Sequence, residues 1–355
     1  MTYRNTQVAR RLILAVGFCA WGLVSAQASI LPRPLPVQNL TAKDGLSSDM
    51  ILSIAVQGDE VWFGTYAGGA TLYDITRRSV KVFTTKGEPQ DKTDDGVSIH
   101  WKNRLPYNHV SAVHLDTDRV WFGTYFYGFG GGGISTYLPN SKAPWRKYST
   151  FNSRAKKVVS LAVDPAGVWV GSERGLSFLD KKTGQWSAFH STKDGLAGNF
   201  VNALLNETDV LWAGTNAGIG RFDKARKSWK TYGAQDGLDD VDVKALIPVG
   251  RSIWAGTSGG ALFSYDRDRD RWQKIVAPDS IPKGCVNSLA SSGALVFIAR
   301  DDGVSICDTS SNQWDGLTQA DGLASDTVLC AAAAKDGVWF GTDQGASFLR
   351  MERQK

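Results

Sequence analysis

Trp62-Phe-Gly-Thr65 decides the fold of this chain, because the segment recurs at regular intervals along it. The other copies, one of them degenerate, follow at intervals of 42 to 59 residues: Trp121-Phe-Gly-Thr124, Trp169-Val-Gly-Ser172, Trp212-Ala-Gly-Thr215, Trp254-Ala-Gly-Thr257, Phe297-Ile-Ala-Arg300 and Trp339-Phe-Gly-Thr342. A period of about 40 to 50 residues is typical of a four-stranded β-propeller blade. Seven copies therefore predict an all-β, seven-bladed β-propeller over residues 29–351.

The residues around each copy predict the four strands of a blade. An aliphatic residue stands eleven positions before each Trp, and a small residue follows it two positions later. Such a strand suits the crowded axis of a propeller, so we expect it to be innermost. The Trp-x-Gly-Thr segment is then the second strand, whose Gly permits a close backbone approach. Asp residues mark the end of the third strand, and their regular recurrence favours turn capping over catalysis: Asp74, Asp180, Asp223, Asp266 and Asp308.

An Asp-Gly-Leu turn leads from one blade to the next, as at Asp194-Gly-Leu196, and its Gly suits a positive φ. A further copy, Asp44-Gly-Leu46, has no complete blade before it. Residues 37–40 precede it at the spacing of a fourth strand, whereas the last repeat stops after its third strand. We therefore expect the N-terminal strand to complete the C-terminal blade, which would hide both edges of an open ring.

The first 28 residues are predicted to be a secretory signal peptide. A basic start at Arg4, Arg10 and Arg11 is followed by an apolar run over 12–24 and by small residues at Ser25-Ala-Gln-Ala28. A retained membrane anchor is the alternative, but the run is shorter than the roughly 20 apolar residues of a spanning helix. We expect cleavage and a periplasmic or extracellular location.

The composition argues against several kinds of partner and site. The formal net charge is +5 and falls once the leader is removed, and no basic run with interleaved aromatics indicates nucleic-acid binding. Three cysteines remain after cleavage, Cys285, Cys307 and Cys330, and none is spaced as a metal clip, so we interpret them as small buried strand residues. We expect no cofactor, no metal and a monomer.

The combination of Asp-Gly-Leu, an aliphatic strand and Trp-x-Gly-Thr resembles the two-component regulator propeller repeat, over nearly the whole mature chain. In that family the repeats commonly form periplasmic sensor regions ahead of a membrane span and a kinase. The sequence here ends at Lys355 without such a region. The resemblance thus implies a propeller that senses a ligand or binds a partner, and a separate sensor kinase is one such partner.

Two insertions into the repeat are the predicted binding site, because departures from a regular scaffold are where function concentrates. One lies between Phe83 and Val110 and the other follows Thr124. In an up-and-down blade both emerge on the same face, above blade 2, so they should meet. The candidates are His100, Trp101, Tyr107, His109, Tyr125, Phe126, Tyr127 and Phe129. Loops decorated with mutually packed aromatics are the alternative interpretation.

Three function classes remain open at this point. A binding or sensing module for a small extracellular ligand, a glycan or a protein is favoured, because no constellation of catalytic groups is evident. A propeller lyase or hydrolase acting on polysaccharide or peptide is the second, by analogy with the streptogramin lyases, whose related fold carries His-dependent catalysis. A purely structural envelope component is the third. No catalytic residue is assigned.

Overall fold

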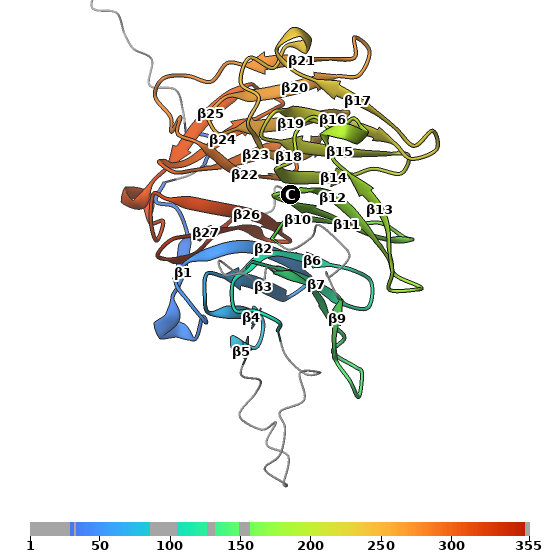
Figure 1. The fold of residues 1–355 in the computed structure, drawn as a ribbon. Coiled ribbons are helices and arrows are strands. Elements are labelled where there is room, and N and C mark those ends of the chain that lie inside the picture. Colours follow the sequence, from blue (N-terminus) through green and yellow to red (C-terminus); the bar gives the residue numbers. More distant parts are fainter. Residues whose placement is uncertain (1–28, 32, 86–104, 126–131, 149–156, 352–355) are drawn as a thin grey trace, which may run out of the picture.

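The computed structural model shows seven four-stranded antiparallel sheets arranged in a ring (Figure 1). It describes residues 29–31, 33–85, 105–125, 132–148 and 157–351. Each sheet is one blade, and in six of the seven the strands run in sequence order from the axis outwards. The predicted fold class is confirmed. Among the described residues, no helix is long and apolar enough to cross a membrane.

The strands occupy equivalent positions in all blades. The innermost are β2 (Ile51–Gln57), β6 (Val110–Leu115), β10 (Val158–Val163), β14 (Val201–Asn206), β18 (Val243–Val249), β22 (Val286–Ser292) and β26 (Val328–Ala334). The second are β3 (Glu60–Thr65), β7 (Val120–Thr124), β11 (Gly167–Ser172), β15 (Val210–Thr215), β19 (Ser252–Thr257), β23 (Leu295–Arg300) and β27 (Gly337–Thr342). The third are β4 (Gly69–Asp74), β8 (Gly133–Tyr137), β12 (Gly175–Asp180), β16 (Gly218–Asp223), β20 (Leu262–Asp266), β24 (Gly303–Asp308) and β28 (Gly345–Arg350). The outermost are β5 (Ser79–Phe83), β9 (Trp145–Tyr148), β13 (Trp186–His190), β17 (Ser228–Tyr232), β21 (Arg271–Ile275), β25 (Gln313–Leu317) and β1 (Val37–Leu40).

The ring closes as predicted, because β1 is the outermost strand of the seventh blade. It pairs antiparallel with β28, and Val37 lies opposite Leu349. In Figure 1 the blue N-terminal strand accordingly lies beside the red C-terminal blade. Joining the two ends of the chain in one sheet removes the open edges that an unclosed ring would expose.

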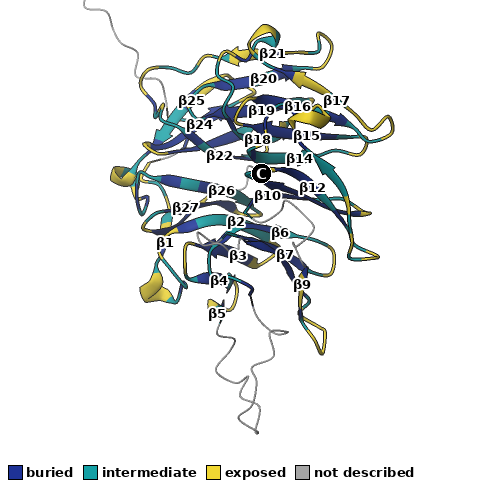
Figure 2. Ribbon diagram, in the orientation of Figure 1, coloured by how far each residue is buried: buried dark blue, intermediate teal, exposed yellow. Residues whose placement is uncertain are grey.

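The core lies between the blades. Trp62 of β3 packs edge-on against Phe122 of the next blade, with ring centroids 5.5 Å apart, and Phe63 meets Trp339 of the preceding blade at 5.4 Å. Figure 2 shows mainly intermediate residues along the innermost strands and exposed residues mainly at the turns, while the second and third strands are mostly buried. The repeated Trp therefore fastens neighbouring blades, and removing one would cost about 3–5 kcal/mol.

The Gly of the repeat is needed for this approach. A Cβ on Gly341 would lie 2.5 Å from Cys330 Sγ and 2.6 Å from Ile51 Cγ2 of the neighbouring blade. The blades could not pack at this separation with any larger residue. The Trp-x-Gly-Thr segment is thus explained by packing.

Short 3-10 turns carry the chain from one blade to the next: η1 (Ala42–Asp44), η3 (Thr192–Asp194), η4 (Ala234–Asp236) and η5 (Gln319–Asp321). Each ends at the Gly of Asp-Gly-Leu with a positive φ of 97° to 108°. The Asp residues that end third strands accept hydrogen bonds from turn N–H groups, as Asp180 does from Thr183. Turn capping is therefore confirmed for these carboxylates.

The degenerate sixth repeat has a physical explanation. Arg300 replaces the usual Thr and is buried, and its guanidinium donates to the carbonyl oxygens of Gly260 and Gly284 at 3.0 and 2.7 Å. It also donates to the Ser305 hydroxyl at 2.9 Å. Arg300 therefore joins blade 5 to the turn that leads into blade 6, as a structural substitute for Thr.

Candidate functional site

A bulge at the start of every innermost strand directs one side chain per blade into the central channel. The register shifts between Val158 and Ser160 in β10, and the same shift occurs in the other six innermost strands. A bulge re-aims the extra residue, here towards the axis. The seven bulged residues line a channel of about 240 Å³: Leu52, Ser111, Val159, Asn202, Lys244, Asn287 and Leu329.

The channel wall has a polar side and an apolar side. Asn202, Lys244 and Asn287 stand on the adjacent blades 4 to 6, whereas Leu329 and Leu52 stand on blades 7 and 1. The two amides bind carbonyl oxygens of the following blade, Val243 at 2.9 Å and Val328 at 2.9 Å. Their first role is therefore to hold neighbouring blades together.

Lys244 differs from these amides. Its ammonium pairs with Asp242 of its own strand end at 3.1 Å, and both side chains are about one-third exposed. Among the described residues this is the ammonium that lines the channel. It gives the polar side of the channel a charged group that water or a ligand can reach.

The mouth of the channel is formed by two turns from each blade. The residue after the second strand donates its N–H to the carbonyl of the residue before the innermost strand, as Tyr125 does to His109 at 3.0 Å and Tyr66 to Met50 at 3.0 Å. The expected placement of these two turns on one face is therefore correct. We call this face the mouth face.

Three rings from blades 1 and 2 lie in a row on the mouth face. The His109 imidazole meets the Tyr66 ring edge-on with centroids 4.9 Å apart, and it lies 5.2 Å from the Tyr125 ring. Burial lowers the pKa of His109, which keeps the imidazole neutral at pH 7. Tyr66 is 41% exposed. The row thus offers a partly apolar surface with polar edges.

Blade 3 extends this row with charged groups. The Tyr125 hydroxyl donates to Glu173 Oε1 at 2.7 Å, and the Lys157 ammonium donates to Tyr125 Oη at 3.1 Å. Lys157 also pairs with Glu173 at 3.0 Å and lies 4.8 Å above the Tyr125 ring. Burial, then the hydrogen bond to Glu173, raises the pKa of Tyr125. We name the five residues the ledge: Tyr66, His109, Tyr125, Lys157 and Glu173.

The structure brings together some of the predicted site residues. His109 and Tyr125 lie side by side in the ledge. Tyr107 lies under the Lys147 ammonium of β9 at 5.7 Å, on the outer part of blade 2. The remaining candidates fall outside the described residues: His100, Trp101, Phe126, Tyr127 and Phe129.

Sequence reasoning missed Tyr66, Lys157 and Glu173. They occupy ordinary repeat positions: Tyr66 and Glu173 follow the Thr or Ser of the second strand, and Lys157 precedes an innermost strand. A comparison of the seven blades at one repeat position, the residue after the second strand, could have pointed to this region. After the second strand, blades 1 and 2 carry Tyr, whereas the other blades carry small or polar residues.

Two features of the described residues bear on catalysis. No group of three His, Cys, Asp or Glu side chains among them could hold a metal ion. The letters Gly256-Thr-Ser-Gly-Gly260 match the spacing of a hydrolase nucleophile motif, but they form the hairpin between β19 and β20. That motif requires a turn from a strand into a helix. Ser258 is therefore a turn residue.

The three cysteines that the structure describes, Cys285, Cys307 and Cys330, are free thiols. Cys307 and Cys330 are buried strand residues, as expected. Cys285 differs from the expectation, because it is half-buried and stands just before β22, at the mouth face. Burial, then the Asp301 carboxylate, raises its pKa, so the thiol is protonated at neutral pH.

Comparisons with known proteins show the likeness at the level of structure. No family model and no curated protein matches the sequence. The extracellular domain of a putative hybrid two-component system from B. thetaiotaomicron superposes with a TM-score of 0.71 at 18% identity, covering 89% of this chain and 42% of that one. The chain has the fold of such extracellular domains. The resemblance to the two-component regulator propellers is thus confirmed for the fold.

Two further solved structures give the same result. The extracellular domain of a putative one-component system from the same organism has a TM-score of 0.70 at 17% identity, covering 90% of this chain and 41% of its own. The computationally designed Ika8 protein has a TM-score of 0.56 at 14% identity, covering 85% and 96%. This chain therefore spans about two-fifths of the length of the two bacterial domains.

Proposed function

We propose that this chain is an exported propeller that binds a ligand or a protein partner through its mouth face. The observation that carries the proposal is the convergence of side chains from three blades in the ledge. A regular repeat would put equivalent residues on every blade, but here two tyrosine rings and an imidazole meet on blades 1 and 2, beside the Lys157–Glu173 pair of blade 3. The axial channel is lined by Lys244 and starts at the same strand ends. Ligand sites usually combine a concavity with a few polar groups, and the channel and the ledge would supply these two parts.

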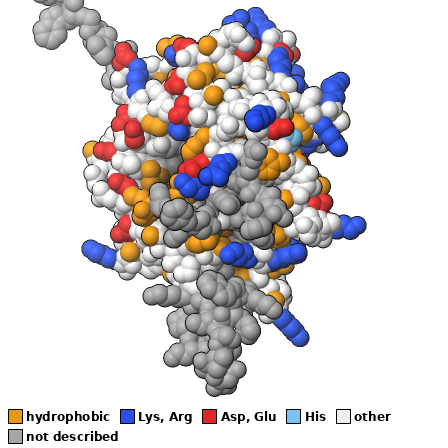
Figure 3. Space-filling model, viewed as in Figure 1, with side chains coloured by type: hydrophobic (Ala, Val, Ile, Leu, Met, Phe, Trp, Pro, Cys, Tyr) orange, Lys and Arg blue, Asp and Glu red, His pale blue; other side chains and the backbone are white. Residues whose placement is uncertain are grey.

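Several observations support export and sensing. The bacterial domains that share the fold are described as extracellular. Residues 1–28 have the basic start, the apolar run and the small residues of a secretory leader. Charge is mixed on the face shown in Figure 3, where Lys and Arg side chains alternate with Asp and Glu among the described residues, and a surface of this kind does not favour nucleic acid. A separate sensor kinase would be a suitable partner for a propeller that carries a signal.

A thermal-shift screen of glycans and peptides tests the binding function, because a ligand that binds only the folded state raises Tm. Each hit is then titrated by calorimetry against Tyr66→Ala and Tyr125→Ala. We expect Kd to rise at least ten-fold in both ledge variants. Tyr107→Ala is the matched control, because this tyrosine lies on the outer part of blade 2, and its Kd should stay within two-fold.

Two outcomes would contradict the proposal. A ligand whose Kd is unchanged in both ledge variants would place the site elsewhere. Turnover of a glycan or peptide, lost in His109→Ala, would show that the mouth face is catalytic.

A further inference from the structure

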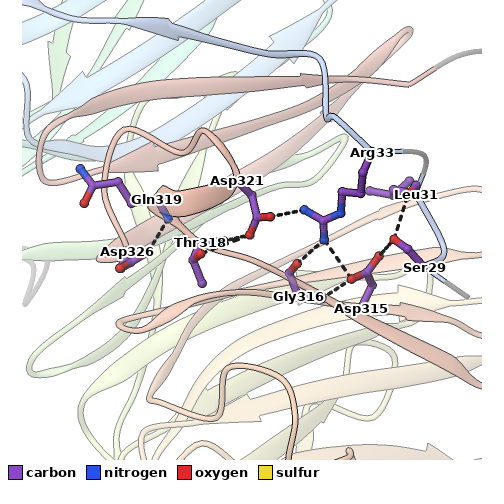
Figure 4. Close-up of polar contacts among 9 residues, drawn as sticks. All are labelled: Ser29, Leu31, Arg33, Asp315, Gly316, Thr318, Gln319, Asp321 and Asp326. Carbon is purple, nitrogen blue, oxygen red and sulfur yellow. Dashed lines mark hydrogen bonds and ion pairs between the residues drawn. The ribbon is translucent and has the colours of Figure 1, made fainter. Parts of the chain in front are cut away.

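The chain ahead of β1 is fastened to blade 6, one blade away from the sheet that β1 completes. Figure 4 shows the contacts: the Ser29 hydroxyl donates to Asp315 Oδ2 at 2.6 Å, and Arg33 reaches both Asp315 and Asp321. Asp315 belongs to β25, and Asp321 ends the turn η5. Residues 29–31 and 33–36 therefore bridge the last two blades. We call residues 29–31 and 33 the N-terminal clasp.

Apolar burial holds the clasp in place. Leu31 is 9% exposed and belongs to the core cluster of blades 6 and 7, together with Leu317 and Leu323. Its backbone carbonyl oxygen lies 2.7 Å from the same Ser29 hydroxyl, whose single proton is shared between this oxygen and Asp315 Oδ2. The position of Ser29 is thus fixed from both sides, by Leu31 and by Asp315.

The charges at the contact between the clasp and blade 6 do not balance. Asp315 and Asp321 bring two carboxylates, and Arg33 is the cation that contacts them among the described residues. Arg33 also donates to the Gly316 carbonyl at 2.9 Å. The Asp315 side chain is only 12% exposed, so its excess negative charge is poorly screened by water. One further positive charge beside Asp315 would neutralise the group.

The sequence around Ser29 indicates how a positive charge can arise there. The small residues Ala26-Gln-Ala28 have the spacing that signal peptidases require, and they end immediately before Ser29. We propose that the peptide bond between Ala28 and Ser29 is hydrolysed on export and that the new α-ammonium of Ser29 pairs with Asp315. This inference rests on the export proposed above, but not on ligand binding.

The reaction is a simple hydrolysis by an enzyme of the signal-peptidase class. Water attacks the carbonyl carbon of Ala28, the bond to the Ser29 nitrogen breaks, and Ala28 leaves with a carboxylate. The freed amine takes up a proton. An α-amino group has a pKa of about 7.7 to 8.0 in an unfolded chain, so it is charged at neutral pH. Ser29 carries this amine beside the hydroxyl that contacts Asp315, which places the ammonium near the same carboxylate.

The pH dependence of this ion pair has a definite sign. A carboxylate beside an ammonium raises the pKa of the ammonium in the folded state. The stabilisation is therefore complete below about pH 7.7 and is lost as the pH rises through the higher folded pKa. An N-terminal extension would move the charge away from Asp315 and remove the stabilisation at every pH.

The first test is the mass of the exported protein. The full chain is expressed in a bacterium with its own leader, and the periplasmic product is analysed by intact-mass spectrometry. We expect a chain that starts at Ser29. A product that starts at any other residue would overturn the proposed processing point.

The second test compares two purified proteins in thermal unfolding. One starts at Ser29, released from a cleavable fusion, and the other retains Ser25-Ala-Gln-Ala28 ahead of it. At pH 7 we expect the protein that starts at Ser29 to melt about 1–3 °C higher. The difference should vanish at pH 10.5 and in Asp315→Asn. Asp239→Asn, which removes an exposed carboxylate of blade 5, should preserve it.

A further measurement covers the case in which Asp315→Asn does not fold. The rate at which cyanate modifies the α-amine is followed against pH in the protein that starts at Ser29, because only the neutral amine reacts. A midpoint above about 8 supports the ion pair, since 8 is the ordinary upper value. A midpoint at or below 8, or equal melting temperatures at pH 7, would overturn it. Ligand binding at the mouth face would be unaffected by either outcome, so the two proposals fail separately.

Discussion

Tyr125 and Glu173 join two blades at the mouth face, because the phenol of Tyr125 donates a 2.7 Å hydrogen bond to the Glu173 carboxylate. The bond extends the aromatic row of blades 1 and 2 into the charged pair of blade 3. A ligand that contacts the Tyr125 ring would therefore also meet Lys157 and Glu173.

Tyr125→Phe tests the contribution of this bond to binding. It keeps the ring and removes the hydroxyl, so the free energy of unfolding should fall by less than about 1 kcal/mol. For a ligand found in the thermal-shift screen, we expect about a five-fold rise in Kd, which corresponds to the loss of about 1 kcal/mol. Calorimetry measures the change. Equal affinity in the wild type and the variant would show that the hydroxyl does not position the ledge.

His114 should make the protein less stable in mild acid. Burial, with Lys181 nearby, lowers the pKa of His114 more than the Asp116 carboxylate raises it. The unfolded chain therefore binds a proton near pH 6.5 that the folded chain resists. Stability is complete above this pH and falls as the pH drops below it, by on the order of 1 kcal/mol per unit of pKa depression.

Urea denaturation at pH 7.5 and pH 5 measures this effect. In His114→Gln the difference between the two pH values should shrink. His190, whose pKa burial also lowers, remains in that variant and accounts for part of the residual dependence. An unchanged pH dependence in His114→Gln would contradict the assignment to His114.

Lys224→Met should destabilise the protein, because it removes an ion pair between blades 3 and 4. The Lys224 ammonium pairs with Asp164 at 2.6 Å, and the two side chains are 20% and 14% exposed. Burial alone would raise the pKa of Asp164, but hydrogen bonds from Lys224 and the Ala166 N–H keep it below its ordinary value. We expect a loss of about 1–3 kcal/mol, between the values for surface and buried pairs.

Lys274→Met is the matched control for that variant. Lys274 pairs with Asp239 at a similar distance, 2.7 Å, but the side chains are 51% and 61% exposed. The free energy of unfolding should fall by less than about 0.5 kcal/mol in Lys274→Met. Chemical denaturation measures both variants. Equal losses in the free energy of unfolding would show that the burial of the Lys224 pair does not add to stability.

Gly233→Ser should stabilise the protein. The equivalent residue before the other 3-10 turns is Ser or Thr, and the Ser191 hydroxyl donates to Asp194 at 2.8 Å. Gly233 has an extended backbone with φ −140°, and a Cβ there would meet nothing within 4 Å. A serine can therefore bind Asp236 in the same way without strain.

The expected gain is about 0.5–1.5 kcal/mol in the free energy of unfolding, from the new cap and from reduced freedom of the unfolded chain. Gly233→Ala supplies only the second effect, so it should gain less. Thermal and urea denaturation of both variants distinguish the two terms. A serine variant no more stable than the alanine variant would show that the hydroxyl does not reach Asp236.

The local parts of the fold could be predicted because they repeat. The spacing of Trp62 and its equivalents predicts the number of blades, and the position of Asp44 predicts the closing strand. The ledge could be predicted only in part. His109 and Tyr125 belong to it, but Tyr66, Lys157 and Glu173 stand at repeat positions where one residue in isolation carries no signal.

The sequence by itself determined the seven blades, their strand order and the closure by residues 37–40, because each depends on periodic packing that recurs along the chain. Only the tertiary structure decided that blades 1 to 3 share one ledge, that Lys244 points into the channel and that Ser29 and Arg33 reach blade 6. These contacts join residues from different blades or distant positions. They depend on how the closed ring places its blades, and periodicity along one chain carries no information about which unlike side chains meet.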